Sequence, residues 1–416
     1  MLAAYHREAD QQKDFVRQIL IKLIANAFYL LKMRFRLFFL SAVLLLLAAC
    51  QEMPIVQQTP RRHKNKIKRD TVILPLIAPR DSFCIAAVGD IMLGTSYPDN
   101  KTLPSDSILF NSFKNVSDEL RNADVTFGNL EGALLDTGAP AQYKLNLRSK
   151  GYLFRMPQYY AGVLKDAGFN LLSLANNHIG DFGDNGRFGT MHVLDSLGIQ
   201  YGGQVSHPSS IFEIDGVTYG FCAFAPNNQT LSILDLQNAT ATIQNLKQQC
   251  DIVIVSFHGG GEGVAYEHVP LADESYINEK RGDVRAFAHN AIDAGADIIL
   301  GNGPHVCRAM EIYKNRLIAY SLGNFYTYRS VSVAGICGYA PLLKVYVNKK
   351  GEFLKGRILS NIQSHNNGLE VDTLNRALAR IKTLTETDFP QSGLNISDDG
   401  LLTPNANPVD SALVSN

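Results

Sequence analysis

The chain has 416 residues, of which 46% are hydrophobic, and its 39 Lys and Arg residues balance its 39 Asp and Glu residues. This hydrophobic content supports one large globular domain or two smaller ones, and it excludes an intrinsically disordered chain. The balanced charge excludes a global electrostatic field that would attract nucleic acid, so we expect no nucleic-acid partner.

The N-terminal region has the pattern of a secretory signal peptide. Residues 33–49 contain a basic start, an apolar run and a small-residue end before Cys50. A single membrane-spanning helix is the alternative, but the apolar run is well short of the ~20 residues that a span needs. The end of the segment, Leu-Ala-Ala-Cys, resembles the lipobox of bacterial lipoproteins, which implies that Cys50 is lipidated. Residues 1–32 are then a non-native leader, and translation starts at Met33.

The resemblance to a lipobox implies an exported protein that a lipid anchors to a bacterial membrane. Gln51 stands where an aspartate would favour the inner membrane, which favours the outer membrane in a Gram-negative cell. Residues 50–80 are Pro-containing and basic, and we interpret them as a tether, with binding to anionic lipid or polymer as the alternative.

The six cysteines include no C-x-x-C pair, which argues against a structural zinc finger or a redox motif. Cys84 and Cys222 lie in apolar, strand-like runs, where a buried thiol behaves as a small hydrophobic group. The presence of a disulfide stays open at this point.

From residue 83 onward, short apolar runs alternate with helical patterns, which predicts an α/β sandwich around a largely parallel sheet. The expected strands are Phe83–Val88, Asp124–Phe127, Asn170–Leu174, Ile252–Phe257 and Asp297–Leu300. The expected helices are Ser107–Arg121, Gln158–Ala167, Asn185–Leu197 and Val284–Ala294. Two hairpins are expected, at Asp215-Gly216 and near Lys314-Asn315. We expect this domain to span residues 81–345, followed by a C-terminal extension, 346–416, with a polar tail.

Polar side chains follow each of the five expected strands within about four residues. Because ligands gather at the carboxyl ends of strands in such sheets, we expect these side chains to share one rim. They are Asp90, Asn129, Glu131, Asn176, Asn177, His178, His258, Glu262, Asn302 and His305. Their residue types are those that bind divalent metals such as Mn, Zn or Fe.

Two such ions ~3.5–4 Å apart can bind the attacking and the leaving oxygen of a displacement, which favours phosphoester hydrolysis. A histidine that does not bind metal would then protonate the leaving group. Each cluster alone has an ordinary structural explanation: a turn, a surface histidine, or a helix cap near Asp181. The same ligand types at five strand ends favour a site. The sequence has no G-x-S-x-G elbow and no P-loop, and the glycine-rich segment 259–263 is interpreted as a flexible rim loop.

Several sequence blocks resemble a known family. They are AVGDIMLG at 87–94, FGNLEGAL at 127–134, LANNHIGDFG at 174–183, HGGGEG at 258–263, GNGPHV at 301–306 and AYSLGNF at 319–325. They resemble the CapA, or poly-γ-glutamate capsule-synthesis, proteins of the calcineurin-like metallophosphatase superfamily, over roughly residues 83–345. The resemblance implies a four-layer α/β/β/α sandwich with a metallophosphatase-like fold.

The resemblance also implies roles for individual residues. The positions that match metal ligands are Asp90, Glu131, Asn177, His258 and His305, and they imply two divalent ions, Mn, Fe or Zn. His178 matches the catalytic histidine, with Asn177 beside it. Additional candidates are Asn129, Asp181, Glu262, Asn302 and Asn324.

Two departures from the family pattern bear on activity. Relatives often carry a histidine where this chain has Asn302 or Gly303, so one metal ligand is expected to be missing. An aromatic residue commonly follows the fourth block's histidine, where Gly259 stands here, which implies looser substrate stacking.

The favoured interpretation is a metal-dependent, phosphoesterase-like hydrolase that acts on an envelope or capsule polymer. The alternative is a non-catalytic factor on the same fold that binds or exports an anionic polymer such as poly-γ-glutamate, and a purely structural lipoprotein is the third possibility. In the first two cases the expected partners are an anionic envelope or capsule polymer and other capsule-assembly proteins.

Overall fold

The computed structural model describes residues 80–146, 152–365 and 368–405. The predicted leader, the signal peptide, Cys50 and the tether up to residue 79 lie outside these residues. Within the described part of the chain, no helix is both long enough and apolar enough to cross a membrane.

Two large mixed sheets form the centre of the fold. Sheet 1 has the order β21-β22-β18-β17-β1-β2-β5-β6, with β16 also paired to β1. Its strands are β1 (Phe83–Met92), β2 (Val125–Leu130), β5 (Leu171–Ser173), β6 (Gln200–Gly202), β16 (Asn324–Thr327), β17 (Leu342–Val347), β18 (Phe353–Leu359), β21 (Leu394–Ile396) and β22 (Leu401–Pro404). Sheet 2 has the order β14-β15-β13-β10-β8-β7, with β9 paired to β8. Its strands are β7 (Ser209–Ile214), β8 (Val217–Ala225), β9 (Leu231–Ser232), β10 (Ile252–His258), β13 (Ile298–Asn302), β14 (Met310–Tyr313) and β15 (Arg316–Ala319).

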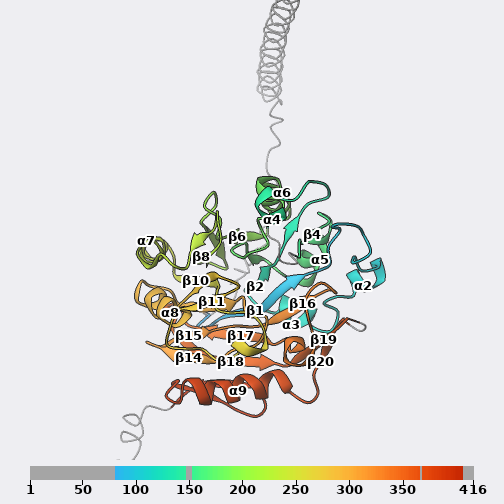
Figure 1. Ribbon diagram of the computed structural model, residues 1–416. Coiled ribbons are helices and arrows are strands. Elements are labelled where there is room, and N and C mark those ends of the chain that lie inside the picture. Colours follow the sequence, from blue (N-terminus) through green and yellow to red (C-terminus); the bar gives the residue numbers. More distant parts are fainter. Residues whose placement is uncertain (1–79, 147–151, 366–367, 406–416) are drawn as a thin grey trace, which may run out of the picture. The chain divides into compact units, whose positions relative to one another are not determined.

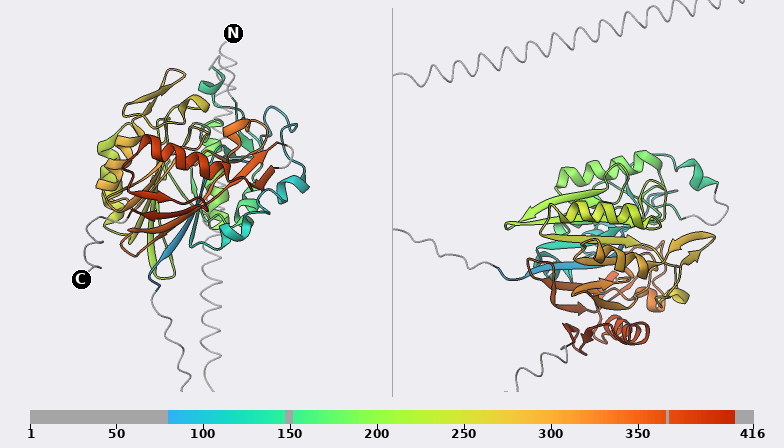
Figure 2. Two further views of the ribbon diagram at one scale, coloured as in Figure 1. Left: turned by 90° about the horizontal axis from the view of Figure 1, so that it is seen from below. Right: turned by 90° about the vertical axis from the view of Figure 1, so that its left-hand side faces the viewer.

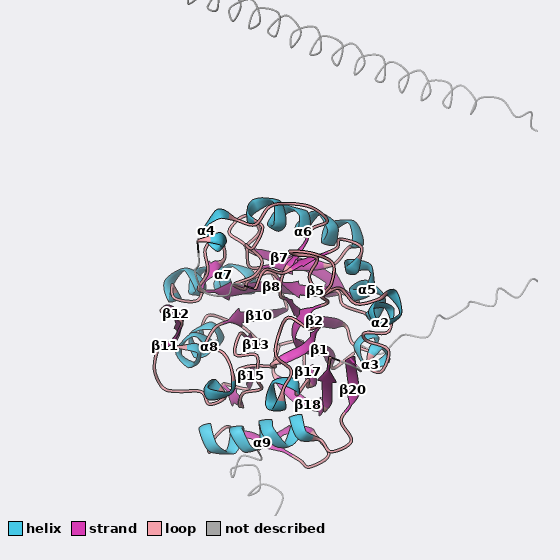
Figure 3. Ribbon diagram, turned by 45° about the vertical axis from the view of Figure 1, so that its right-hand side comes forward, coloured by secondary structure: helices cyan, strands magenta, loops and turns pink. Residues whose placement is uncertain are grey.

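Helices cover the outer faces of the two sheets, as Figure 1 shows with α7 and α8 on one side and α2, α3 and α5 on the other. The helices are α2 (Asp106–Phe110), α3 (Ser117–Arg121), α4 (Gln142–Leu145), α5 (Tyr160–Ala167), α6 (Gly183–Leu197), α7 (Leu236–Lys247), α8 (Val284–Asp293) and α9 (Arg376–Asp388). Three two-stranded pairs, β3 (Ala133–Leu134) with β4 (Arg155–Met156), β11 (Glu274–Tyr276) with β12 (Glu279–Gly282), and β19 (Asn361–Ser364) with β20 (Gly368–Val371), and two 3-10 helices, η1 (Val264–Tyr266) and η2 (Gly335–Gly338), complete the described elements. Figures 2 and 3 show the same layers from other directions.

Three apolar cores hold the layers together. Side chains from both sheets meet between them, for example the rings of Phe127 and Phe221, whose centroids are 5.9 Å apart. A second core joins sheet 1 to α2, α3, α5 and α6, and a third joins sheet 2 to α7 and α8. Burial of one large apolar side chain contributes about 1.5–3 kcal/mol, so these faces account for the layering. The predicted four-layer α/β/β/α sandwich is confirmed.

The five expected strands form β1, β2, β5, β10 and β13, and both expected hairpins are present. Parallel pairing holds for the centre of each sheet, from β1 to β6 and from β8 to β15, whereas β17, β18, β22 and β21 pair antiparallel. The helix predicted for Ser107–Arg121 is wrong in one respect, because it forms two short helices, α2 and α3. Between them the Asn111 amide donates to the Ser107 carbonyl and the Asn115 amide to the Leu369 carbonyl, contacts that compete with helical hydrogen bonding.

The chain after residue 345 belongs to the sandwich. The predicted domain boundary falls inside β17, and β18, β22 and β21 continue sheet 1 from that strand. Helix α9 lies at the bottom of Figure 1, where Ile381 enters the core between the sheets and Phe389 stacks on Tyr320 with ring centroids 5.1 Å apart. The strands β21 and β22 lie in the part of the chain for which the sequence predicts a polar tail.

The cysteines of the described residues are free and buried: Cys84, Cys222, Cys250, Cys307 and Cys337. Burial raises the pKa of the Cys307 thiol to about 12, so this thiol stays protonated and packs as a hydrophobic group.

Candidate metal centre

The carboxyl ends of strands from both sheets bring polar side chains to one place. On sheet 1, Asp90 of β1 lies in register with Asn129 of β2 and with Asn324 of β16. On sheet 2, His258 ends β10 and lies in register with Asn302 of β13. The shared rim expected from the sequence is therefore formed by strands of two different sheets.

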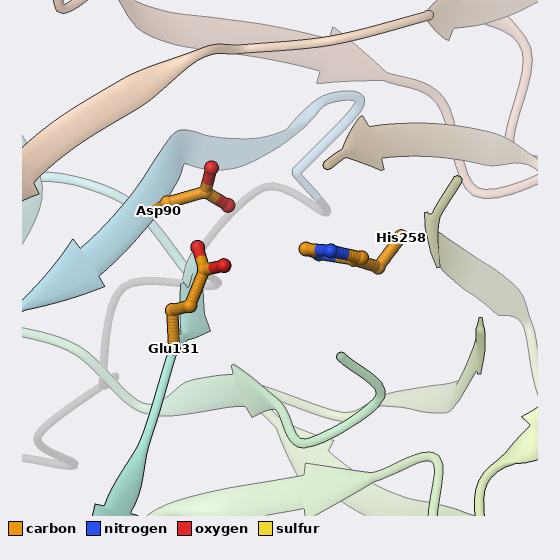
Figure 4. A group of neighbouring side chains, drawn as sticks. All are labelled: Asp90, Glu131 and His258. Atoms are coloured by element: carbon orange, nitrogen blue, oxygen red, sulfur yellow. The ribbon is translucent and has the colours of Figure 1, made fainter. Parts of the chain in front are cut away.

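Asp90, Glu131 and His258 form the centre of this rim. Each offers one ligand atom, and these atoms all lie within 4.8 Å of one another. Figure 4 shows the two carboxylates side by side, with the His258 ring pointing toward them from the opposite side. All three side chains are buried, and within the described part of the chain neither Glu131 oxygen nor either His258 ring nitrogen has a hydrogen-bond partner.

An unpaired buried polar group costs about 1–3 kcal/mol, so several at one point require an explanation. Carboxylate oxygens and an imidazole nitrogen are ligands of Mn, Fe and Zn, and an ion would satisfy all of these atoms at once. The donor set therefore fits a divalent cation.

The charges at the centre are strongly coupled. Burial, and next the neighbouring Asp90, raise the pKa of Glu131 well above its usual range. Burial, and next the positive charges of Arg281 and His305, lower the pKa of His258 well below its usual range. His258 is thus a neutral imidazole at neutral pH, which is the form that binds a metal.

His305 lies beside Asp90 and Glu131. Its Nδ1 is 2.9 Å from Asp90 Oδ2 and 3.1 Å from Asn324 Oδ1, and its Nε2 is 3.6 Å from Glu131 Oε1. Burial alone would lower the pKa of His305, but Glu131 and Asp90 outweigh it and raise the pKa to about 10. The backbone of His305 has a φ of 58°, a conformation that costs a non-glycine residue about 1–3 kcal/mol. The structure thus places this predicted ligand at the centre.

Asn324 holds His305 in this conformation. Its amide donates to the backbone carbonyls of His305, Ser332 and Cys337, while its oxygen faces the His305 ring. Asn129 plays a similar part for Asp90, because its amide donates to Asp90 Oδ1 at 2.8 Å. Both residues, additional candidates from the sequence, orient ligands by these contacts.

The loop after β5 carries Asn177 and His178, and Asn176 fixes its conformation. The Asn176 amide donates to Asn129 Oδ1 and to the Leu130 carbonyl, and its oxygen accepts from the backbone of His178 and Ile179. Asn177 Oδ1 is buried with no hydrogen-bond partner among the described residues, so its amide oxygen is free to bind an ion.

His178 is held on two sides. Its Nδ1 lies 2.9 Å from Asp181 Oδ2, and its ring stacks on Phe154 with centroids 4.1 Å apart. Asp181 is fully buried and also accepts from the Phe154 backbone. Burial would raise the pKa of Asp181, but His178 and Lys144 outweigh it and lower the pKa, so the carboxylate is ionised. Asp181 is therefore a partner of His178 and caps no helix by its side chain.

Glu262 and Asn302 lie at the edges of the centre. Glu262 Oε1 is 2.8 Å from Arg281 Nη2, and the charge of Glu262 contributes to the raised pKa values of Glu131 and His305. Asn302 Oδ1 is buried and unpaired within the described part of the chain, so this amide oxygen is free to bind an ion.

The two departures from the family pattern contact each other. A Cβ on Gly303 would lie 2.9 Å from both the backbone N and the backbone O of Gly259. The Gly259 backbone N donates to the Asn302 carbonyl at 2.9 Å, and Gly303 has a φ of +116°. A side chain at position 303 is therefore excluded unless the His258–Gly259 backbone moves.

We expect Gly303→Ala to lower the free energy of unfolding by about 1–3 kcal/mol or more, since it adds a steric clash to an unfavourable φ. Gly216→Ala is the matched control, because Gly216 has a φ of +78° and its Cβ would meet nothing within 4 Å. Urea unfolding of both variants checks this. Equal losses would mean that the approach of Gly259 has no energetic consequence.

Three structural residues of the centre escaped the sequence prediction: Lys144, Arg281 and Arg308. Arg281 is 1% exposed and joins Glu262 to the Gly260 carbonyl and to Glu279. Lys144 and Arg281 do not follow an expected strand, and the residue types of all three are those of ordinary surface charges, so nothing local marks them as structural.

The family model of the bacterial capsule synthesis protein PGA_cap matches residues 84–329. The chain belongs to this family. The matched segment begins in β1 and ends after β16, so it contains every candidate residue from Asp90 to Asn324.

Three curated relatives have names that refer to capsule, PGA or polyglutamine synthesis. The capsule biosynthesis protein CapA of Bacillus anthracis is 29% identical over 264 residues, which cover 59% of this chain and 60% of that protein. The PGA biosynthesis protein CapA of Bacillus subtilis is 32% identical over 265 residues, covering 59% and 63%. A probable polyglutamine synthesis accessory protein of Mycobacterium tuberculosis is 30% identical over 227 residues, covering 48% and 55%. The chain thus spans less than two thirds of the length of these relatives.

Solved structures show weaker likenesses. A hypothetical protein from Thermus thermophilus has a TM-score of 0.40 and 15% identity, covering 67% of this chain and 99% of that one. A putative 5'-nucleotidase from Staphylococcus aureus has a TM-score of 0.38 and 14% identity, covering 73% and 58%. The chain is therefore assigned to the PGA_cap family by the family match and not by these structures.

Proposed function

We propose that this capsule-synthesis family member is a metal-dependent hydrolase with a phosphoesterase-like site that acts on an envelope or capsule polymer. The observation that carries the proposal is the set of buried, unpaired ligand atoms of Glu131 and His258 beside Asp90. A second favourable observation is the nearby histidine, His178, which is oriented by a carboxylate.

Asp90, Glu131 and His258 would hold one divalent ion, Mn, Fe or Zn. For a second ion the remaining donors are His305 and the unpaired amide oxygens of Asn177 and Asn302. Such ions supply Lewis-acid polarisation of a phosphoryl oxygen and lower the pKa of bound water. Asn129 and Asn324 keep the ligands oriented, as an outer layer of hydrogen bonds does in metal sites.

His178 has the contacts of a general acid. Because Nδ1 donates its proton to the Asp181 carboxylate, a second proton on Nε2 would make the ring an imidazolium, and this Nε2 proton is the one that can pass to a leaving oxygen. Stacking on Phe154 keeps the ring plane fixed while the substrate changes. The resemblance to the family and this geometry both support a general-acid role for His178.

A non-catalytic polymer-binding or export factor is the second candidate, favoured by one observation. Asn302 replaces an imidazole with an amide oxygen, and the backbone at Gly303 leaves no space for a side chain there. A centre with one weaker ligand binds a second ion less tightly. Such a site would still recognise an anionic polymer through a bound cation.

We further propose that the protein is exported and lipid-anchored through Cys50, in the outer membrane if the cell is Gram-negative, with other capsule-assembly proteins as partners. The signal-peptide pattern of residues 33–49 supports export. Radiolabelled palmitate incorporation into wild type and Cys50→Ala tests the anchor. Labelling that persists in Cys50→Ala would contradict it.

The metal-dependent activity has a direct test. We expect purified protein to carry roughly one or two equivalents of Mn, Fe or Zn and to hydrolyse bis(p-nitrophenyl) phosphate. Asp90→Ala and His305→Ala should lose the metal and the activity, whereas His192→Ala, at an exposed position on α6, should keep both. Elemental analysis and the absorbance of released nitrophenol are the measurements. Failure to bind any of the three ions would eliminate the hydrolase and leave polymer binding.

A further inference from the structure

The short segment 141–144, at the start of α4, contacts the loop that carries Asn177 and His178 at three backbone positions. The Ala141 N–H donates to the Asp181 carbonyl at 2.8 Å. The Tyr143 hydroxyl donates to the Gly180 carbonyl at 2.8 Å, and Lys144 Nζ donates to the Asn177 carbonyl at 2.7 Å. One segment therefore holds the loop along its length.

Lys144 has a second contact that the other residues of the segment lack. Its Nζ lies 2.7 Å from Asp181 Oδ1, and the two side chains are 12% and 0% exposed. The other carboxylate oxygen, Oδ2, accepts from the Phe154 backbone and lies 2.9 Å from His178 Nδ1. Lys144, Asp181 and His178 thus form a buried chain of three charged or polar groups.

Without Lys144, Asp181 Oδ1 would be a buried carboxylate oxygen with no positive charge beside it. A carboxylate in that position rotates or takes up a proton, and either change alters the oxygen that faces His178 Nδ1. Arginine at this position would retain the charge, whereas methionine would retain only the length of the side chain.

We propose that Lys144 is a positioning residue for the general acid, acting through Asp181 to fix the tautomer and the orientation of His178. This inference rests on the proposed hydrolase function. Lys144 contacts neither Asp90 nor Glu131, and it reaches Asn177 at the backbone carbonyl and not at the amide oxygen that is free to bind an ion, so we expect its effect to fall on proton delivery and not on retention of metal.

The kinetic test uses Lys144→Met in the full chain with bis(p-nitrophenyl) phosphate. We expect kcat to fall about 10–100-fold, as for other groups that orient a functional side chain, with KM and bound metal unchanged. Lys144→Arg should restore most of the rate. Tyr143→Phe is the matched control on the same helix, because it removes the contact with Gly180 and leaves Asp181 paired; its kcat should stay close to wild type. Equal losses in Tyr143→Phe and Lys144→Met would overturn the proposal in favour of a general role in packing.

A double-mutant cycle separates positioning from folding. If Lys144 acts through Asp181, the pair Lys144→Met and Asp181→Asn should be no slower than the slower single variant. Additive losses would contradict the chain of contacts. Thermal unfolding verifies that each variant folds, and Lys144→Gln, which keeps an N–H donor without the charge, replaces Lys144→Met if that variant does not.

A readout without turnover distinguishes this inference from the proposed function. Nitrogen-15 NMR of histidine-labelled protein, with the His178 signals assigned by their loss in His178→Gln, reports the tautomer. We expect Nδ1 to be protonated in wild type, whether or not Nε2 also carries a proton, and a mixture of the two neutral tautomers in Lys144→Met. Unchanged His178 signals would overturn the positioning role even if the enzyme is active. The expected change in a protein that hydrolyses nothing would support the positioning role and reject only the hydrolase.

Discussion

In Glu131→Gln we expect binding of divalent metal to be lost while the metal-free protein becomes more stable by about 1–3 kcal/mol, because the substitution removes a buried negative charge beside Asp90. Both Glu131 oxygens are buried without a hydrogen-bond partner within the described residues, and the charge lies close to Asp90. Without a metal ion, burial and the charge of Asp90 outweigh the attraction of His305, so the ionised Glu131 carboxylate opposes folding. With a cation the same two charges provide the binding energy, so the substitution changes the two properties in opposite directions.

The raised pKa of Glu131 predicts how the stability of the metal-free protein changes with pH. The folded-state pKa of Glu131 lies well above its unfolded value, chiefly because of burial. Such a group binds its proton more tightly in the folded state, so its contribution favours folding most at a pH below about 4.3, its unfolded pKa. That contribution is lost as the pH rises through the folded pKa. The gap in stability between Glu131→Gln and metal-free wild type should therefore widen as the pH rises.

Thermal unfolding in the presence of a chelator, at a series of pH values, measures the stability of the metal-free protein. The same experiment with added Mn or Zn measures metal binding. Metal should raise the melting temperature of wild type and leave that of Glu131→Gln unchanged. Glu119→Gln is a suitable control, because Glu119 of α3 is half exposed and pairs with Lys344 of β17 and not with a residue of the centre. A Glu131→Gln variant that is less stable than metal-free wild type would show that Glu131 has a structural role.

The central strands could be predicted because their apolar runs are continuous and end at polar residues. Ile252–Phe257 is buried along its whole length and leads directly into His258. Strand β18 could not be recognised in this way, because only some of its residues are buried and its place is decided by pairing with β17. Helix α7 is another example. Asn238, Thr240 and Thr242 have low helix propensity, and the helix depends on a cap by Asp235 and on burial against sheet 2.

The candidate metal ligands could be predicted for a related reason: each one lies at the carboxyl end of a strand, or in the loop just after it, on the shared rim. Residues that orient these ligands or their neighbours have no such signal in the sequence. Lys144 lies 37 positions before Asp181 in the chain, and its ion pair exists only because α4 folds back over the loop. Long-range polar pairs of this kind depend on tertiary contacts, and local sequence patterns do not contain them.

The glycine-rich loop after β10 shows how the fold changes an interpretation. The sequence predicts a flexible rim loop at residues 259–263, but the structure ties it down. The Gly261 N–H donates to Glu274 Oε1, the Gly260 carbonyl accepts from Arg281, and the Gly263 N–H donates to the Pro304 carbonyl. The glycines allow two buried guanidinium groups to approach the backbone, since a Cβ on Gly260 would lie 2.7 Å from Arg308 Nη1. The loop is thus a fixed support for Glu262.

Arg308→Met should produce the largest loss of stability of any single change considered, about 3–5 kcal/mol, because it leaves Glu274 as a buried charge without its partner. The Arg308 and Glu274 side chains are 0% and 4% exposed and form a bidentate ion pair, with Nη2–Oε1 at 2.6 Å and Nη1–Oε2 at 2.9 Å. Arg308 Nε also donates to the Tyr266 carbonyl at 2.7 Å. Urea unfolding of metal-free protein measures the loss.

The double variant Arg308→Met with Glu274→Leu shows whether the charges of this pair or the packing of its side chains account for the loss of stability. Replacing both members of a buried ion pair with apolar residues is often nearly neutral, so the double variant should recover most of the stability. Its metal affinity should nevertheless stay below wild type, because the Gly261 N–H loses its acceptor and the loop that carries Glu262 loosens. Recovery of stability without recovery of affinity would locate the role of this pair in holding the loop. A double variant as unstable as Arg308→Met would instead show that the size and shape of the two side chains, and not their charges, hold the loop in place.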